Sequence, residues 1–169
     1  QNNVQGACDM GGLPNVFTGY QSVADAAIKD KFEKAWGAKL NQTPGLTLTE
    51  IFPAAGKGQI KAIYLIGENP VLSDPDSNHI KECLEKLDFL VVQDMFLTET
   101  AQLADVVLPS ASFAEKDGTY TNTERRVQRI RKAFQPFGNS KPDWEITCLI
   151  ARKMKGKGFD FTDPSEIMD

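Results

Sequence analysis

Three short apolar runs, each ending in polar residues or a proline, constrain the fold of this chain more than any other feature. Residues 61–66 lead into the turn Gly67–Pro70, residues 89–92 lead into Gln93 and Asp94, and residues 104–108 lead into Pro109 and Ser110. Such runs are typical of strands in a buried parallel sheet, whose carboxyl ends meet at one edge where ligands bind. The sequence therefore predicts an α/β protein with one shared binding edge.

Amphipathic segments around those runs predict the helices of the same fold. Helices are expected over residues 22–36, 49–55, 76–87 and 98–103, the first capped by Ser22 and ended by Gly37. Strand, helix, strand, helix, strand is the order of a parallel sheet with right-handed crossovers. Residues 1–20 are predicted to form an irregular loop, because they are rich in glycine and amides. Such residues suit a ligand wall, but composition alone favours an ordinary surface loop.

The pattern changes after residue 112. Residues 118–130 are rich in strand-forming types and predict an irregular β excursion. A helix over 144–154 follows, with Asp143 as its expected cap and with Ile146, Leu149, Ile150 and Met154 facing inward. Asp163 is expected to cap one more helix. Because that helix is cut short and the chain starts without methionine, we expect an excised piece of a longer protein.

Composition limits the classes of function. At 169 residues the chain suits one domain, and its net charge of −4 disfavours a general nucleic-acid binder. No apolar run approaches the roughly 20 residues of a membrane span. Cys8, Cys83 and Cys148 lack metal-ligand spacing, so we expect free thiols in a reducing compartment and no metal ligands. His79, the only histidine, is expected at the surface.

Polar residues at the strand ends are the candidate binding groups. Asn69 and Ser73 can hydrogen-bond a ribose or a base, and a carboxylate such as Asp94 or Asp143 can accept two parallel N–H bonds from a guanine edge. Turns and caps use the same residue types, so a local structural role stays open for each. Walker and Gly-x-Gly-x-x-Gly patterns are absent, and no nucleophile–base pair emerges. The residues alone predict an α/β ligand-binding domain.

A basic segment forms the second candidate surface. It comprises Arg125, Arg126, Arg129, Arg131 and Lys132. A solvated strand face explains it as well as contact with phosphate groups or a partner protein does.

An ordered set of segments resembles one known family. The segments are Gln1–Gly11, Gly67–Pro70, Val92–Asp94, Thr98–Ala101, Ala104–Pro109 and Gly118–Gln128. Together they closely resemble the molybdopterin oxidoreductase family, and most closely the catalytic alpha subunit of formate dehydrogenase. The resemblance runs over nearly the whole chain.

The resemblance implies a Rossmann-like, three-layer αβα domain with a mostly parallel sheet and a small β excursion. Residues 1–112 would form the cofactor-binding α/β domain, residues 113–140 an excursion belonging to a neighbouring domain of the parent, and residues 141–169 the return helix and a truncated end. The domain would hold the guanosine part of a molybdopterin guanine dinucleotide, one of two, carrying molybdenum or tungsten. The parent would also carry a 4Fe-4S cluster that this chain does not ligate.

The same resemblance assigns roles residue by residue. Those implied to contact the guanosine part are Gly67, Glu68, Asn69 and Ser73 after the first strand, Gln93 and Asp94 after the second, and Asp143, which would recognise guanine. Gln1 matches a glutamine near the substrate pocket.

The implied reaction in the full subunit is oxidation of formate to carbon dioxide, and the isolated piece is expected to be inactive. Expected partners are the remaining domains of the subunit and electron-transfer subunits or carriers, with no nucleic acid. We expect a cytoplasmic parent, with the periplasm still open. Alternatives are the equivalent piece of a nitrate reductase-like molybdoenzyme or of a respiratory NADH dehydrogenase, or a stand-alone nucleotide-binding or interaction module.

Overall fold

A computed structural model describes residues 3–168 of the chain, which divide into two compact units. One unit contains the residues up to Ile51 together with Thr119–Gln128, and the other contains Phe52–Gly118 and the residues from Arg129 onward. Among the described residues, no helix combines the length and the apolar character that crossing a membrane requires.

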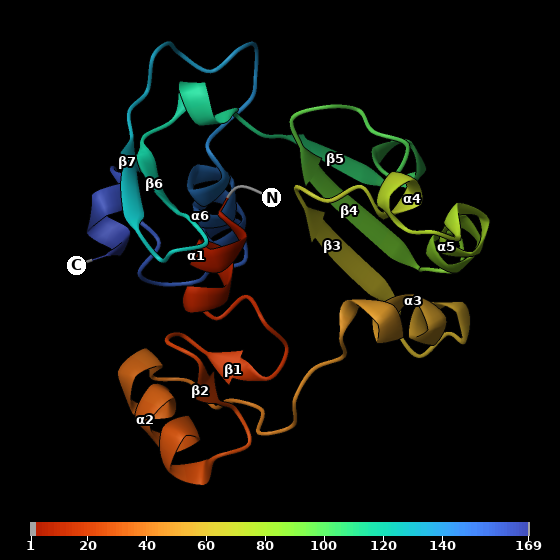
Figure 1. Cartoon of the computed structure of the whole chain (residues 1–169), viewed down its shortest axis with the longest axis horizontal. Coiled ribbons are helices and arrows are strands. Elements are labelled where there is room, and N and C mark those ends of the chain that lie inside the picture. The colour runs from red at the N-terminus through yellow and green to blue at the C-terminus, as the bar shows by residue number, and fades with distance from the viewer. Residues whose placement is uncertain (1–2, 169) are drawn as a thin grey trace. The chain divides into compact units, whose positions relative to one another are not determined.

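The second unit is built on a three-stranded parallel sheet. Its strands are β3 (Ala62–Ile66), β4 (Phe89–Asp94) and β5 (Val106–Pro109), in that spatial order (Figure 1). The register sets Leu65 opposite Val92 and Val92 opposite Val107. The predicted strands and their parallel pairing are therefore confirmed, and the chain is a mixed α/β protein.

Short helices cover the core of this sheet. They are α3 (Leu48–Gly56), α4 (Pro70–Ser73), α5 (Ser77–Leu84) and the 3₁₀ turn η1 (Ala101–Leu103). One apolar cluster joins them to β4: Phe52, Val71, Ile80, Cys83, Leu84, Leu90, Val92 and Ala101. Leu90 and Val92 alternate with Val91 and Gln93 along β4, so Gln93 lies on the opposite face of the sheet.

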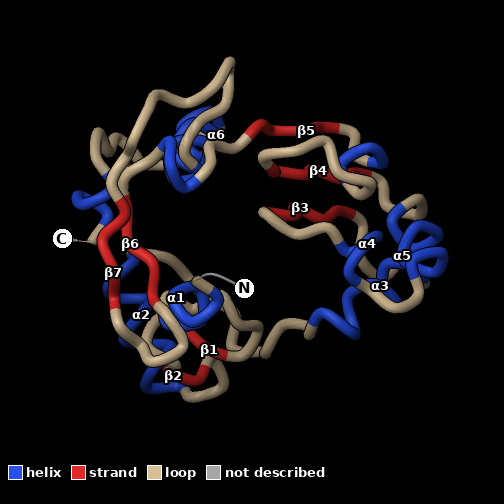
Figure 2. The backbone as a smooth tube through the Cα atoms, turned by 45° about the horizontal axis from the view of Figure 1, so that its top comes forward, coloured by secondary structure: helices blue, strands red, loops and turns tan. Residues whose placement is uncertain are grey.

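After β5 the chain makes the predicted β excursion. A 3₁₀ turn η2 (Phe113–Glu115) precedes β6 (Gly118–Thr121) and β7 (Val127–Ile130), which form a two-stranded sheet (Figure 2). Helix α6 (Asp143–Lys153) and the 3₁₀ turn η3 (Pro164–Ile167) complete the chain. The side chain of Asp163 caps η3, as predicted.

Two expectations about α6 are wrong. Asp143 is the first helical residue and makes no side-chain cap, because Pro142 holds the cap position and the carboxylate is engaged elsewhere. Met154 lies past the last helical residue and is 78% exposed, whereas Ile146 is buried as predicted.

The first unit contains more regular structure than the sequence predicts. The expected loop over residues 1–20 is wrong where α1 (Val4–Asp9) and β1 (Val16–Phe17) form; β1 pairs with β2 (Gln21–Ser22). Helix α2 (Ala26–Trp36) is capped by Asp25, not Ser22, because Ser22 belongs to β2. Gly37 ends α2 with a φ of 63°, as predicted.

Aromatic packing holds α2 to β1 within this unit. The ring centroids of Phe17 in β1 and Phe32 in α2 lie 4.7 Å apart. Within α2, the ring centroids of Phe32 and Trp36 lie 4.9 Å apart. Phe32 is buried, whereas Trp36 keeps about half of its surface exposed. Such ring pairs contribute beyond the area that they bury.

Candidate functional site

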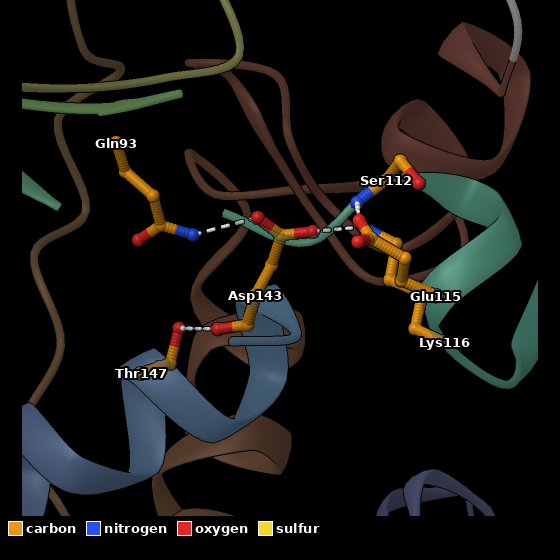
Figure 3. Close-up of polar contacts among 6 residues, drawn as sticks. All are labelled: Gln93, Ser112, Glu115, Lys116, Asp143 and Thr147. Atoms are coloured by element: carbon orange, nitrogen blue, oxygen red, sulfur yellow. Dashed lines mark hydrogen bonds and ion pairs between the residues drawn. The ribbon is translucent and has the colours of Figure 1, made fainter. Parts of the chain in front are cut away.

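The Asp143 carboxylate lies at the centre of a polar cluster in the second unit. The Gln93 side-chain amide donates to Asp143 Oδ1 at 2.7 Å, and the Lys116 ammonium donates to Oδ2. Figure 3 shows the two donors on opposite sides of the carboxylate. Inside its own helix, the Asp143 carbonyl accepts from the Thr147 hydroxyl at 3.0 Å. The cluster therefore joins β4, the segment after η2 and the first turn of α6.

Gln93 is held from both ends. Its side chain is fully buried, and its Oε1 accepts from the Tyr64 hydroxyl of β3. Tyr64 lies opposite Val91, which places it on the same face of the sheet as Gln93. Partial burial, and then the negative charge of Asp143, raise the pKa of the Tyr64 hydroxyl, so it remains a donor at neutral pH. The amide of Gln93 is thereby oriented with its N–H toward Asp143.

The Asp143 carboxyl stays ionised in spite of its burial. Burial by itself would raise the pKa of this group, but the hydrogen bond and charge of Lys116 and the amide of Gln93 outweigh it and hold the pKa below its ordinary value. The Asp143 side chain is 39% exposed and that of Lys116 is 20% exposed. The site therefore presents a partly accessible, negatively charged oxygen pair.

Ser110 contributes an unusual feature of this site. The residue is 8% exposed, and its hydroxyl oxygen is fully covered yet has no hydrogen-bond partner among the described residues. The hydroxyl lowers the pKa of Asp143, so it lies near the carboxylate without reaching ordinary hydrogen-bond geometry. Buried hydroxyls without a partner are rare in native proteins, and each calls for an explanation.

A second polar cluster follows β3, and it is saturated. Asn69 Oδ1 accepts from the Thr100 hydroxyl at 2.7 Å and from the Thr100 N–H at 3.3 Å, while its amide donates to Glu99 at 2.8 Å. The Thr100 hydroxyl also accepts from the Val71 N–H at 3.2 Å. The amide of Asn69 lowers the pKa of Glu99. These bonds tie the start of α4 to η1.

The other residues that the resemblance implies lie around the same edge. Gly67 adopts a φ of 66° in the turn after β3, and its N–H donates to the Gln93 carbonyl at 2.9 Å. Asp94 accepts from the Phe96 N–H at 3.0 Å, which fixes the turn after β4. The side chains of Glu68 and Ser73 are exposed. Gln1 lies outside the described residues.

The structure brings Gln93 and Asp143 into direct contact, although 50 positions separate them in the sequence. Asn69 belongs to the separate cluster with Glu99. Sequence reasoning missed Lys116, Tyr64 and the role of Ser110. Of these, only Ser110 carried a signal, since it directly follows the third apolar run. Lys116 stands in a loop whose sequence gives no clue to its partner.

The first unit has a cavity of its own, of about 580 Å³. It is lined by Asn3, Val4, Gln5, residues 120–123 and Gln128. The Asn3 carboxamide accepts from the Thr121 N–H at 2.9 Å, which anchors α1 to β6. Of residues 1–20, three therefore line a cavity, and a ligand role for this segment stays a prediction.

The basic segment is partly paired. The Arg125 guanidinium stacks on the ring of Tyr20, 5.2 Å from the ring centre. A guanidinium nitrogen of Arg129 lies 3.6 Å from a carboxylate oxygen of Asp117. No group of three or more His, Cys, Asp or Glu side chains within residues 3–168 could hold a metal ion.

Comparison with known proteins finds relatives that are similar to this chain in sequence. The chain is 55% identical over 168 residues to a putative formate dehydrogenase of Staphylococcus haemolyticus, covering 99% of this chain and 17% of that protein. It is 56% identical over 170 residues to a formate dehydrogenase subunit alpha of Methanocaldococcus jannaschii, covering 100% of this chain and 25% of that protein. The chain thus spans a quarter or less of the length of these relatives.

A solved structure shares the fold. The acetylene hydratase from Pelobacter acetylenicus matches with a TM-score of 0.62 and 22% sequence identity, over 83% of this chain and 20% of that one. The family model described as molybdopterin oxidoreductase matches residues 1–153. Since this match takes in the sheet, the β excursion and all of α6, the chain belongs to the molybdopterin oxidoreductase family.

Proposed function

We propose that this chain is the part of a formate dehydrogenase catalytic subunit that holds the guanosine end of a molybdopterin guanine dinucleotide. The observation that carries the proposal is the ionised Asp143 carboxylate, held between Gln93 and Lys116 beside the carboxyl end of β4. Ligands of open α/β sheets bind outside the carboxyl ends of the strands. The similarity to formate dehydrogenases over 17–25% of their length supports the choice of parent.

The chemistry of the cluster fits a guanine edge. The N1–H and the 2-amino group of guanine are parallel donors, and an ionised carboxylate can accept both. Each carboxylate oxygen has room for a second hydrogen bond, so Gln93 and Lys116 leave acceptor capacity on Asp143. The hydroxyl of Ser110 also lowers the pKa of Asp143, which helps to keep the carboxylate charged for a ligand placed there.

Neighbouring residues complete the proposed site. Asp94 and the turn residues Gly67, Glu68, Asn69 and Ser73 would line the ribose side. We also propose that the sheet belongs to a larger Rossmann-like, three-layer domain in the parent. In that arrangement residues 1–112 contribute to the cofactor domain, 113–140 to a neighbouring domain, and 141–169 return to the first.

When bound, the molybdopterin cofactor with its molybdenum or tungsten supplies the two-electron oxidation of formate to carbon dioxide. The residues of this chain bind and orient the nucleotide end. We propose that Gln1 lies near the substrate pocket, that the 4Fe-4S cluster belongs to another part of the subunit, and that the remaining domains and electron-transfer proteins are the partners. The three free cysteines fit a cytoplasmic parent.

The test in the full-length subunit is Asp143→Ala. Removing the carboxylate takes the charged partner from the guanine edge, which weakens its binding by about 2 kcal/mol or more. We expect lower molybdenum or tungsten and guanine content in the purified variant, measured by metal analysis and nucleotide release. Glu145→Ala, in the same helical turn but paired with Lys141, is the matched control. Unchanged cofactor content in Asp143→Ala would refute the assignment.

The isolated chain allows a direct test of base recognition. Calorimetric titration with guanosine, inosine and adenosine separates the donors, because inosine lacks the 2-amino group. Preference for guanosine over inosine supports the site, and Asp143→Asn should abolish that preference. Equal binding of all three nucleosides would remove the guanine-specific interpretation.

A further inference from the structure

We propose that Lys116 is a positioning residue for guanine: it is the fixed counter-ion that lets Asp143 remain charged and aligned when a ligand covers it. This inference rests on the proposed function. Lys116 comes from the segment after η2 and reaches the first residue of α6, so the pair joins two elements that 27 positions separate.

The placement of the two donors supports this role for Lys116. Gln93 and Lys116 contact different oxygens of Asp143 from opposite sides, which fixes the plane of the carboxylate (Figure 3). Gln93 cannot follow a moving partner, because it is fully buried in β4 and held by Tyr64. A cation on the other oxygen is therefore needed to keep the carboxylate from turning about its own bonds.

Loss of water from the Asp143 carboxylate on ligand binding also calls for a nearby cation. The Asp143 side chain keeps 39% of its surface exposed, and a bound base would remove much of that contact with water. An isolated carboxylate covered in this way loses its hydration without compensation, and it tends to take up a proton instead. The Lys116 side chain is only 20% exposed, and its ammonium is already in contact with Asp143 and supplies the missing positive charge. A protonated carboxyl would keep only part of its acceptor capacity for the two donors of guanine.

Within residues 3–168, Lys116 also has no other interaction that would explain its position. No partner other than Asp143 is found for its ammonium among the described residues. A half-buried lysine that serves only as a surface charge would keep its ammonium in water.

Titration of the 169-residue chain with guanosine and inosine, both uncharged, provides the test. We expect Lys116→Met to weaken guanosine binding by about tenfold and inosine binding by less, so that the selectivity narrows. Lys116→Arg should restore the selectivity, because it returns a cation to Asp143. Lys141→Met, which removes an exposed lysine paired with Glu145, should change neither. Guanosine binding by Lys116→Met that equals or exceeds that of the wild type would overturn the inference.

A measurement on the unaltered chain guards against a variant that fails to fold. The Lys116 ammonium resonance, followed by nuclear magnetic resonance, should keep its ion-paired character when guanosine is added. Release of the ammonium on binding would show that the lysine competes with the ligand and would overturn the inference. If the wild-type chain binds guanosine no better than inosine, the proposed guanine site itself fails, and this role of Lys116 fails with it.

Discussion

Two buried hydroxyls at the same edge of the sheet have opposite surroundings. The Thr100 hydroxyl donates to Asn69 and accepts from the Val71 N–H, whereas the Ser110 hydroxyl has no partner among the described residues. The Asn69 cluster is thus complete within the chain, while the Asp143 cluster is charged and incompletely paired. A saturated cluster stabilises the fold, and an unsaturated one is where a ligand gains most.

The largest expected effect on stability comes from Thr100→Val. Valine keeps the shape but leaves the Val71 N–H and one Asn69 bond without the hydroxyl, so we expect the free energy of unfolding to fall by about 2 kcal/mol. Chemical denaturation of the isolated chain measures it. Selectivity for guanosine over inosine should not change.

Thr100→Ser is the matched control, because it keeps the hydroxyl and removes only a methyl group. Its loss of unfolding free energy should be at most about half of the loss in the valine variant. Equal losses in the two variants would show that packing, not hydrogen bonding, makes Thr100 important.

Tyr64→Phe tests the Asp143 cluster, because Tyr64 holds the buried side-chain amide of Gln93 in that cluster. The change leaves Gln93 Oε1 without its donor in a fully buried position, which costs about 1 kcal/mol of unfolding free energy. Because the Gln93 amide then loses its fixed orientation, guanosine binding should weaken as well. A stability loss with unaltered guanosine binding would separate Gln93 from ligand recognition.

Lowering the pH should weaken the Asp143 cluster, with a smaller loss of unfolding free energy than Tyr64→Phe causes. The pKa of Asp143 is lower in the folded chain than its ordinary value of 3.8. Its contribution is therefore fully present above that value and is lost as the pH falls through the lower, folded pKa. Unfolding measured from pH 5 down to pH 2 should show a shallower acid loss for Asp143→Asn than for the wild type.

The Asn69 cluster supplies the comparison for this pH dependence. Glu99 also has a lowered pKa, held down by the Asn69 amide, but its carboxylate is exposed to water. Glu99→Gln should therefore change the acid profile less than Asp143→Asn does. If Glu99→Gln changed the acid profile more than Asp143→Asn does, the charge that stabilises the fold would lie in the Asn69 cluster and not in the Asp143 cluster.

The sequence predicted what depends on local pattern and missed what depends on long-range contact. Runs such as residues 61–66 and 89–92 identified the strands, because continuously apolar runs are typical of parallel strands. The expected burial holds for the interior of β4 but is wrong for β3, in which every second residue is exposed. Helix α1 was missed because its residues, VQGACD, contain a glycine and few apolar side chains at helical spacing.

Site prediction met the same limit. Asp143 precedes an amphipathic helix, and cap and ligand roles use the same residue type, so its pattern alone could not exclude a cap. The guanine role came from the resemblance to a family. Lys116 could not be predicted, since only the folded chain brings a loop lysine to a helix that starts 27 positions later.

The smallest expected effect on stability, and the sharpest for the comparison, belongs to Ser110→Ala. Removing a buried hydroxyl without an ordinary hydrogen-bond partner takes away only the weakest of the groups that lower the pKa of Asp143, so the unfolding free energy should stay within about 0.5 kcal/mol of the wild-type value. If that hydroxyl meets a ligand, guanosine binding should weaken several-fold in the same variant. A clear loss of stability without guanosine would mean that Ser110 has a structural bond after all, and the two hydroxyls would then share one role.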